Sequence, residues 1–444
     1  MCGACPEPMK SSATSANIGR FQSMPAPLLQ GFGGEAMITC GIDWADAKHR
    51  VCILDGSGEK LTSFDVAHTP EGLEKLDERL LKCAGGPGEV RIALETKDSL
   101  LVDFLSERGY TLYFLNPKQT DRFRDRHRMS SAKDDDFDAY VLADAVRTDA
   151  HLLEEVSPLD ERTVLLRVLT RTRVAIVERK VACQNELTAA LKRYFPAALR
   201  LFDDLTHPAG LDFLLRYPTH GQASQAPLAA VVGLLKEHGF LEHQAQRRAA
   251  HILAVLQEPQ LKPAASAAAA YPGAVSSLLR ELRSAMEEIT ALDRQIEKAF
   301  AEHPDKAIFE SLPGFAQVLA PVLAAEVGGD VSRFSSVREL KALGGSSPVT
   351  KRSGKYCTIQ MRYACNENLR RALHLGSQAA VQQCGWARDL YDGLRARNCK
   401  YGRALRAVAG QLLEMLYVML KRKACYDEGY HLRMKETHGK PSLA

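Results

Sequence analysis

The sequence predicts an α/β plus α protein, in which a mixed α/β domain is followed by a mainly helical remainder. Between residues 38 and 149, short β-rich runs alternate with amphipathic segments. From residue 158 onward, apolar residues recur at three- and four-residue steps, which is the period of helices. At 444 residues the chain is long enough for two or three domains.

The α/β domain is expected to span residues 37–156, after a disordered leader at 1–36. Three strands come in succession, and two helix–strand units and a last helical pattern follow them. This order, βββαβαβα, is that of a ribonuclease-H-like sheet. The expected elements are strands at 38–43, 50–55, 60–66, 89–95 and 111–115 and helices near 70–83, near 98–108 and up to about 149.

Four carboxylates stand where such a sheet brings side chains together. Asp43 ends the first strand and Glu95 ends the fourth. Asp135 and Asp138 are three residues apart, hence on one face of the last helix. Acids that converge without a cation repel one another, so a cluster of this kind typically binds a hard divalent ion, and Mg²⁺ is the expected cofactor. The alternative is that these acids cap strand ends and a solvated helix start.

Cations cluster just before the acidic pair. Lys118, Arg122 and Arg126 belong to a cation-rich helical segment, which is expected either to position nucleic-acid phosphates or to form a solvated helix face. The net charge of +4 is modest, so the basic character is local, and local clusters suit a polyanionic partner.

The middle of the chain, 157–304, is expected to hold two helical coiled-coil arms. One helical pattern runs from 158 to 195 and another from about 275 to 303, which suggests an antiparallel pair of arms roughly 40 Å long. Between them, 197–274 contains shorter helices and a low-complexity join that reads as a tolerated insertion. Long helical pairs often dimerise, and a purely intramolecular spacer is the alternative.

A mainly helical domain is expected at 305–430, before a flexible tail at 431–444. Its start, Leu312-Pro313-Gly314-Phe315 between two helices, has the form of a helix-hairpin-helix element, whose backbone N–H groups face a DNA phosphate. A helix from Asn366 to Ala380 carries Arg370 and Arg371.

Between these helices, residues 345–355 read as a loop that holds a phosphate. The stretch combines Pro and Gly with three cations, Lys351, Arg352 and Lys355. It also offers three hydroxyls as nucleophiles for in-line attack on a phosphodiester: Ser346, Ser347 and Ser353.

Composition indicates the cellular compartment in which the protein is expected. Its eleven cysteines are an odd number at irregular spacing, which favours reduced thiols in the cytoplasm. The longest apolar runs are broken by charge well short of a membrane span, so no membrane partner is expected.

These motifs, in this order, resemble the DEDD transposases of bacterial insertion sequences, specifically the insertion-sequence 110 family, relatives of the pilin-gene invertases. The resemblance covers about 38–156 and 305–425. Asp134 stands where the family usually has Thr. The matching motifs are Gly41-Ile42-Asp43, Ala93-Leu94-Glu95, Asn116-Pro117, Lys133-Asp134-Asp135-Asp136-Phe137-Asp138-Ala139, Gly345-Ser346-Ser347-Pro348, Ser353-Gly354 and Asn366-Glu367-Asn368-Leu369-Arg370.

The resemblance implies a RuvC-like domain, a coiled coil and a second domain in which Ser353 attacks DNA to form a phosphoserine intermediate. It also implies a structured guide RNA that pairs with donor and target DNA, and a bacterial, nucleoid-associated location. Because long arms separate the serine from the acids, the serine of one protomer is expected to work with the acids of another, in a dimer or a dimer of dimers. Two alternatives remain: a RuvC-like metal-dependent resolvase or nuclease in which water attacks, and a non-catalytic DNA-bridging protein.

Overall fold

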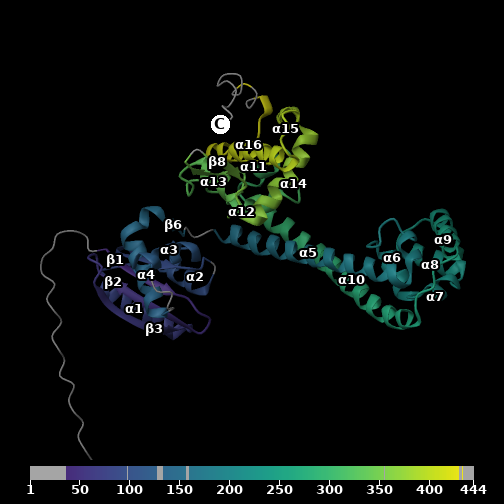
Figure 1. Ribbon diagram of the computed structural model, residues 1–444, viewed down its shortest axis with the longest axis horizontal. Coiled ribbons are helices and arrows are strands. Elements are labelled where there is room, and N and C mark those ends of the chain that lie inside the picture. The colour runs from purple at the N-terminus through teal and green to yellow at the C-terminus, as the bar shows by residue number, and fades with distance from the viewer. Residues whose placement is uncertain are drawn as a thin grey trace, which may run out of the picture. The chain divides into compact units, whose positions relative to one another are not determined.

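The computed structural model describes residues 37–97, 99–127, 134–156, 160–354, 356–429 and 433. The predictions for the leader, for Lys133, for Lys355 and for the tail other than residue 433 lie outside these residues. The chain forms two compact units, Met1–Pro158 and Leu159–Ala444, which are described separately (Figure 1).

The first unit is built on a six-stranded sheet with the strand order β3-β2-β1-β4-β5-β6. β1 pairs antiparallel with β2 and parallel with β4, and β4 continues parallel to β5. The elements follow one another in the order expected from the sequence, so the mixed α/β prediction is confirmed. The strands are β1 Ile38–Asp43, β2 Lys48–Leu54, β3 Lys60–Ala67, β4 Val90–Leu94, β5 Thr111–Phe114 and β6 Glu154–Glu155.

Helices cover the sheet. Each helix begins at residues that end the extended segment before it. At the first helix, the Thr69 hydroxyl accepts a hydrogen bond from the N–H of Gly72 and Pro70 fills the first turn, so the chain enters the helix with its donors satisfied. Leu76 and Leu80 then reach the core. The helices are α1 Pro70–Cys83, α2 Leu100–Glu107, α3 Pro117–His127 and α4 Asp135–Asp149, with short 3₁₀ turns at Pro87–Glu89 and Ala150–Leu152.

Gly41 brings α4 into backbone contact with the central strand β1. A Cβ at this position would lie 2.0 Å from the carbonyl oxygen of Ala139 and 2.5 Å from the amide nitrogen of Ala143. Only the absence of a side chain permits this approach. The first turns of α4, which carry Asp135 and Asp138, are therefore held against the strand that ends in Asp43.

The second unit contains two long helices, α5 Glu161–Tyr194 and α10 Ala265–Ala301, that lie side by side (Figure 1). Arg162 contacts Glu302, Arg173 contacts Asp293 and Cys183 contacts Leu278. Residue numbers rise along one helix as they fall along the other, so the pair is antiparallel. At 34 and 37 residues the helices are about 51 and 56 Å long.

α10 begins about ten residues earlier than expected because it includes part of the low-complexity join, whereas α5 lies within its expected range. The sequence predicts a tolerated insertion here, but the alanine-rich stretch at 265–270 is helical, because alanine has the highest helix propensity of all residues. The segment between the arms packs its own core with the outer arm ends, around Phe195, Phe213, Leu235, Ile252 and Leu279. Its elements are a 3₁₀ turn at Pro196–Arg200 and helices α6 Pro208–Arg216, α7 His220–Ser224, α8 Leu228–Glu237 and α9 Glu242–Gln257.

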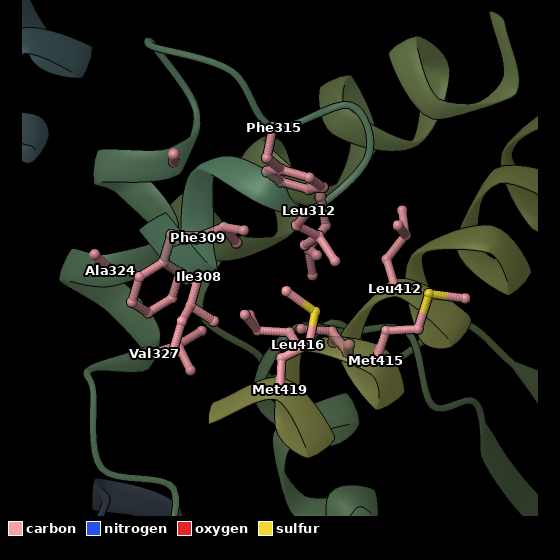
Figure 2. Packing of buried hydrophobic residues seen from close by; sticks show 14 of the residues in the cluster. Ile308, Phe309, Leu312, Phe315, Ala324, Val327, Leu412, Met415, Leu416 and Met419 are labelled. Atoms are coloured by element: carbon pink, nitrogen blue, oxygen red, sulfur yellow. The ribbon is translucent and has the colours of Figure 1, made fainter. Parts of the chain in front are cut away.

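The remaining helices form the C-terminal core of this unit. Figure 2 shows Ile308, Phe309, Leu312 and Phe315 packed toward Leu416 and its neighbours on the last long helix. Leu166 of α5 and Phe300 of α10 belong to the same core, so the arms are rooted in it. The elements are α11 Lys306–Ser311, α12 Ala320–Val327, α13 Val337–Leu343, β7 Val349–Ser353, β8 Tyr356–Gln360, α14 Glu367–Gln383, α15 Gly385–Ala396 and α16 Tyr401–Arg422.

The segment expected to be a helix-hairpin-helix element packs inside this core. Gly314 has φ +83°, and a Cβ there would lie 2.1 Å from the carbonyl oxygen of Gly376 on α14. Phe315 and most of α12 are buried. The contact of this turn with DNA phosphate stays a prediction. Among the described helices, none is both long and apolar enough to cross a membrane.

Candidate active site

The acidic site is prepared by the pairing of two parallel strands. Ile42 of β1 is paired with Leu94 of β4, and Asp43 and Glu95 follow these residues directly. The carboxyl ends of parallel strands meet at one edge of a sheet, so both acids leave the sheet at the same edge. Gly41 holds α4 at this edge as well.

A cavity of about 530 Å³ opens at this edge, and two of the four predicted ligands line it. Asp43 and Asp135 line the cavity together, and Glu95 and Asp138 do not. Asp134 and Asp136 of the acidic motif line it too, as do three charged residues that the sequence did not indicate: Lys48, Arg50 and Asp65.

Asp138 has a guanidinium partner. Its side chain is 6% exposed, and its Oδ1 accepts hydrogen bonds from Nε and Nη2 of Arg124 at 2.9 and 2.8 Å. Arg124 also pairs with Asp121 on its own helix at 2.7 Å. A carboxylate buried at this depth requires a cation, and α3 supplies one.

The two extra aspartates of the motif have structural roles. Asp134 is the N-cap of α4, where its carboxylate accepts a hydrogen bond from the N–H of Asp136 at 3.2 Å. Threonine, the usual residue of the resembling family at this position, is also a good N-cap. Asp134 is therefore a chemically reasonable replacement.

Asp136 fixes the start of α4 to the neighbouring strands. It accepts hydrogen bonds from Lys60 at 2.6 Å, from the Ser63 hydroxyl, and from Arg50 at 2.8 Å. The Lys60 and Ser63 hydrogen bonds, with that from Arg50, hold the pKa of Asp136 well below its usual range. With Asp134 and Asp136 engaged in this way, Asp135 is the exposed acid of the first turn that shares the cavity with Asp43.

The loop after Asp43 is anchored by a buried histidine. His49 Nδ1 accepts the N–H of Ala45 at 3.3 Å, so its Nε2 carries the proton and donates to Nδ1 of His68 at 2.8 Å. Burial, and to a lesser degree the neighbouring His68, lower the pKa of His49 to about 4. Trp44 stacks on the imidazole with 6.3 Å between ring centroids.

The acid set has the chemistry of a Mg²⁺ site, but the described residues do not assemble it into one centre. Carboxylate oxygens are the ligands that hard divalent ions prefer. Within the described residues, however, no group of three or more His, Cys, Asp or Glu side chains is arranged to hold a metal ion. Asp43 and Asp135 are the pair that the cavity brings together.

The predicted phosphate-binding cations of this unit lie on one face of α3. Lys118, Arg122 and Arg126 follow at four-residue steps and are all exposed. Arg126 is partly committed, because its guanidinium contacts Asp149 and the Thr148 hydroxyl, each at 3.2 Å.

The stretch read as a phosphate-holding loop is largely a β-hairpin, so that prediction was wrong in structure. β7 and β8 pair antiparallel from Val349↔Gln360 to Ser353↔Tyr356. Ser353 is the last residue of β7, exposed at the turn, and Gly354 follows it with φ +57°. The hairpin was missed because it is exposed on both faces, and a strand without a buried face lacks the alternation that marks a strand.

The pairing divides the predicted cations of the hairpin between its faces. Side chains alternate along a strand, so Lys351 is on the face of Ser353 and Arg352 is on the opposite face. Tyr356 is the cross-strand partner of Ser353 and shares its face. Lys355 lies outside the described residues.

The two rival serines lie in the segment that leads into β7. The Ser346 hydroxyl donates to the carbonyl of Lys341 at 3.2 Å, and the carbonyl of Ser347 accepts from Nε of Arg362 at 3.3 Å. Both side chains are half-buried, whereas Ser353 is exposed.

The Asn366 motif has a structural role at the start of α14. Its side chain caps the helix by accepting the N–H of Leu369 at 3.0 Å, and it donates to Glu326 at 2.7 Å. Arg370 then pairs with Glu367 at 3.1 Å, and Arg371 pairs with Glu178 of α5.

Comparison with known proteins agrees with this architecture. A family model described as a DEDD transposase of the IS110 type matches residues 40–196, and one described as the transposase IS116/IS110/IS902 family matches 306–392. The mini-circle putative transposase for IS117 of Streptomyces coelicolor is 30% identical over 88% of this chain and 95% of its own length. The insertion element IS110 43.6 kDa protein of the same organism is 27% identical over 87% of this chain and 95% of its own length.

A further relative, the putative transposase y4uE of Sinorhizobium fredii, is 36% identical over 45% of this chain and 56% of its own length. The chain has a ribonuclease-H-like sheet with an acidic edge, and it matches these families and relatives. Together, these findings identify a transposase, an enzyme that recombines DNA. The chain belongs to the IS110/IS116/IS902 family of insertion-sequence transposases.

Proposed function

We propose that this transposase is an RNA-guided, site-specific recombinase that cuts and rejoins DNA through a covalent bond to Ser353. The exposure of Ser353 at the end of β7, with Lys351 on the same face of the hairpin, is the observation that carries the proposal. A nucleophile for duplex DNA has to project from the protein surface, and a neighbouring ammonium attracts the phosphate.

The proposed chemistry conserves the energy of the phosphodiester. Ser353 Oγ loses its proton and bonds to phosphorus, while the bond from phosphorus to one deoxyribose oxygen breaks and that oxygen takes up a proton. In rejoining, a sugar hydroxyl attacks the phosphoserine, and the serine hydroxyl is regenerated. No net hydrolysis occurs, so no external energy source is required.

A denaturing gel tests this step. Element-end DNA incubated with the protein and Mg²⁺ should remain attached to wild-type protein after denaturation and should not attach to Ser353→Ala. Thr350→Ala, an exposed hydroxyl of the same strand, is the matched control and should retain the adduct. Free hydroxyl-ended nicks without an adduct would establish the alternative, a RuvC-like resolvase or nuclease in which water attacks.

We further propose that Asp43, Glu95, Asp135 and Asp138 hold Mg²⁺ at the acidic edge. Supporting this, Asp43 and Asp135 share a cavity, and the strand pairing and Gly41 direct the other two to the same edge. When bound, the ion would stabilise negative charge on phosphoryl oxygens. Asp43 begins the loop that carries Trp44, so metal binding can be followed by tryptophan fluorescence.

The metal site is tested by substituting three acids that line the same cavity. Asp43→Asn and Asp135→Asn should weaken Mg²⁺ or Mn²⁺ binding in calorimetry at least tenfold. Asp134→Thr keeps an N-cap and should bind metal as the wild type does. Equal loss in all three variants would show that the helix start, and not a particular ligand, had been disturbed.

The proposal also includes two kinds of partner, a guide RNA and other copies of the chain. Guidance is supported by family membership, and sequencing the RNA that co-purifies with the protein tests it: absence of a defined structured RNA would contradict it. Self-assembly is supported by four exposed apolar residues on α5, Leu165, Val168, Ala175 and Ala182, of which the last three follow at the seven-residue period of a coiled coil. Sedimentation should show a dimer or tetramer that Val168→Glu dissociates.

A further inference from the structure

The second unit contains a cavity of about 310 Å³ that the proposed chemistry does not use. It lies between α14 and α16, beside the root of the β7–β8 hairpin. Ser346, three residues before β7, and Met361, one residue after β8, both line it. The hairpin that carries Ser353 therefore rises from the wall of this cavity.

The cavity has an apolar floor. Leu373 of α14 and Leu405 and Ala409 of α16 line it and are each at most 4% exposed, and Met361 closes one side. A floor of this kind favours a flat, weakly polar group over a fully hydrated ion.

The rim of the cavity is cationic. Arg370, Arg371 and Arg406 line it, and Glu367 is the one carboxylate among the lining residues. Glu367 pairs with Arg370, and Arg371 pairs with Glu178 outside the cavity. Among the described residues, Arg406 has no ion-pair partner, which leaves its charge available for a ligand.

Size and chemistry together define the ligand. The volume is at the lower end of the range for small-molecule sites, roughly 300–1,000 Å³, so the cavity admits one unit of a polymer and not a duplex. An apolar floor under guanidinium groups suits a nucleobase with its phosphate, because bases stack on apolar and guanidinium surfaces while phosphate binds the cations.

We propose that this cavity receives one unstacked nucleotide of the DNA substrate, with the base against Leu373 and Leu405 and a phosphate at Arg406 and Arg370. The proposal requires that the protein act on DNA, which its family membership establishes, and does not depend on whether Ser353 or water attacks. Unstacking one nucleotide beside the hairpin root would fix the register of the DNA relative to Ser353.

The geometry also limits where that nucleotide lies. Five residues of β7 span about 17 Å at roughly 3.3 Å per residue. This distance equals about five steps of a DNA strand, at 3.4 Å per step. The unstacked position should therefore lie within about five nucleotides of the cut.

Fluorescence of 2-aminopurine tests the proposal with the full-length protein and its co-purifying RNA. The base analogue is placed in turn at each position within ten nucleotides of the cut in element-end DNA, and its emission rises when it is unstacked. With wild-type protein a rise is expected at one position. Arg406→Gln should abolish this rise and weaken DNA binding roughly tenfold, the loss expected for one charge-assisted contact.

Arg403→Gln is the matched control, because Arg403 lies one turn earlier on α16, is exposed and does not line the cavity. It should leave the rise unchanged. No rise at any position, or an equal effect of both substitutions, would overturn the proposal. A rise only with 2-aminopurine in the RNA would overturn the assignment to DNA. The readout requires no cleavage, so its failure is distinct from failure of the serine chemistry.

Discussion

At the scale of single residues, the acidic edge shows how neighbours decide what an aspartate does. Three consecutive aspartates at the start of α4 line the cavity, yet Asp134 caps the helix and Asp136 binds cations of β2 and β3, which leaves Asp135 as the candidate metal ligand. The sequence alone identified the acids but could not divide these roles. The roles depend on strand residues more than seventy positions away, which have no mark in the local pattern.

His49 makes the same edge sensitive to acid. Its folded pKa of about 4 is lower than the ordinary value near 6.5, so between these pH values the unfolded chain holds a proton that the folded chain does not. Stability of the first unit should therefore fall as the pH drops from 6.5 to 4, by at most about 3 kcal/mol.

Trp44 reports this titration because it stacks on His49. In a Trp386→Phe protein, Trp44 fluorescence should change with a midpoint near pH 4, and His49→Gln should abolish the change. A midpoint near pH 6.5 would mean that the imidazole is not buried as described.

The hairpin offers a second comparison of neighbouring residues. Because Lys351 shares a face with Ser353 and Arg352 does not, Lys351→Gln should slow adduct formation by about tenfold to a hundredfold, as loss of one charge-assisted contact does. Arg352→Gln should have a smaller effect on the rate. Single-turnover kinetics with saturating DNA separates the two, and equal effects would show that the cations act only by their net charge.

At the scale of elements, much of the first unit could be predicted because β1, β2, β4 and β5 contain buried apolar residues. The strand at 38–43 and the helix at 70–83 were predicted with the bounds that the structure has. The two-residue β6 is too short for any pattern, and the pairing of Arg124 with Asp138 depends on how α3 meets α4. The β7–β8 hairpin was not predicted because its residues are mostly exposed on both faces, so it lacks the alternation of buried and exposed residues that marks a strand.

Gly41 tests how closely α4 must approach β1. Gly41→Ala places a methyl group against the backbone of Ala139 and should destabilise the first unit by about 3 kcal/mol or more, as overpacking does. Metal affinity should fall with it, because Asp135 moves away from Asp43. Gly88→Ala, where a Cβ meets nothing within 4 Å, is the control. Thermal unfolding with and without Mn²⁺ measures both effects, and wild-type stability in Gly41→Ala would refute the close contact.

At the scale of the second unit, one buried carboxylate joins the arm to the C-terminal helices. Glu326 of α12 is 1% exposed, binds Arg171 of α5 through two hydrogen bonds of 2.9 Å and accepts from Asn366 at the start of α14. Burial alone would raise the pKa of Glu326, but the bonds from Arg171 and Asn366 lower it.

Removing this link should loosen α14 from the arm. Arg171→Met leaves Glu326 buried with weaker compensation and should cost roughly 3 kcal/mol in chemical denaturation. Arg173→Met, which breaks an exposed pair with Asp293, should cost less than about 1 kcal/mol. Hydrogen exchange in the first turn of α14 should accelerate only in Arg171→Met. Equal costs for the two variants would mean that Glu326 does not couple the helices.

The low stability of the exposed β7–β8 hairpin affects which substrates the protein binds. A two-stranded hairpin without a packed face is marginally stable in water, so part of the free energy of any partner is spent on ordering it. The apparent affinity for a substrate is the intrinsic affinity multiplied by the fraction of molecules in which the hairpin is formed. A partner that contacts both faces of the hairpin gains enough binding free energy to offset this loss. A partner that contacts only the turn does not. Conformational entropy thereby discriminates complete substrates from partial ones before any bond is broken.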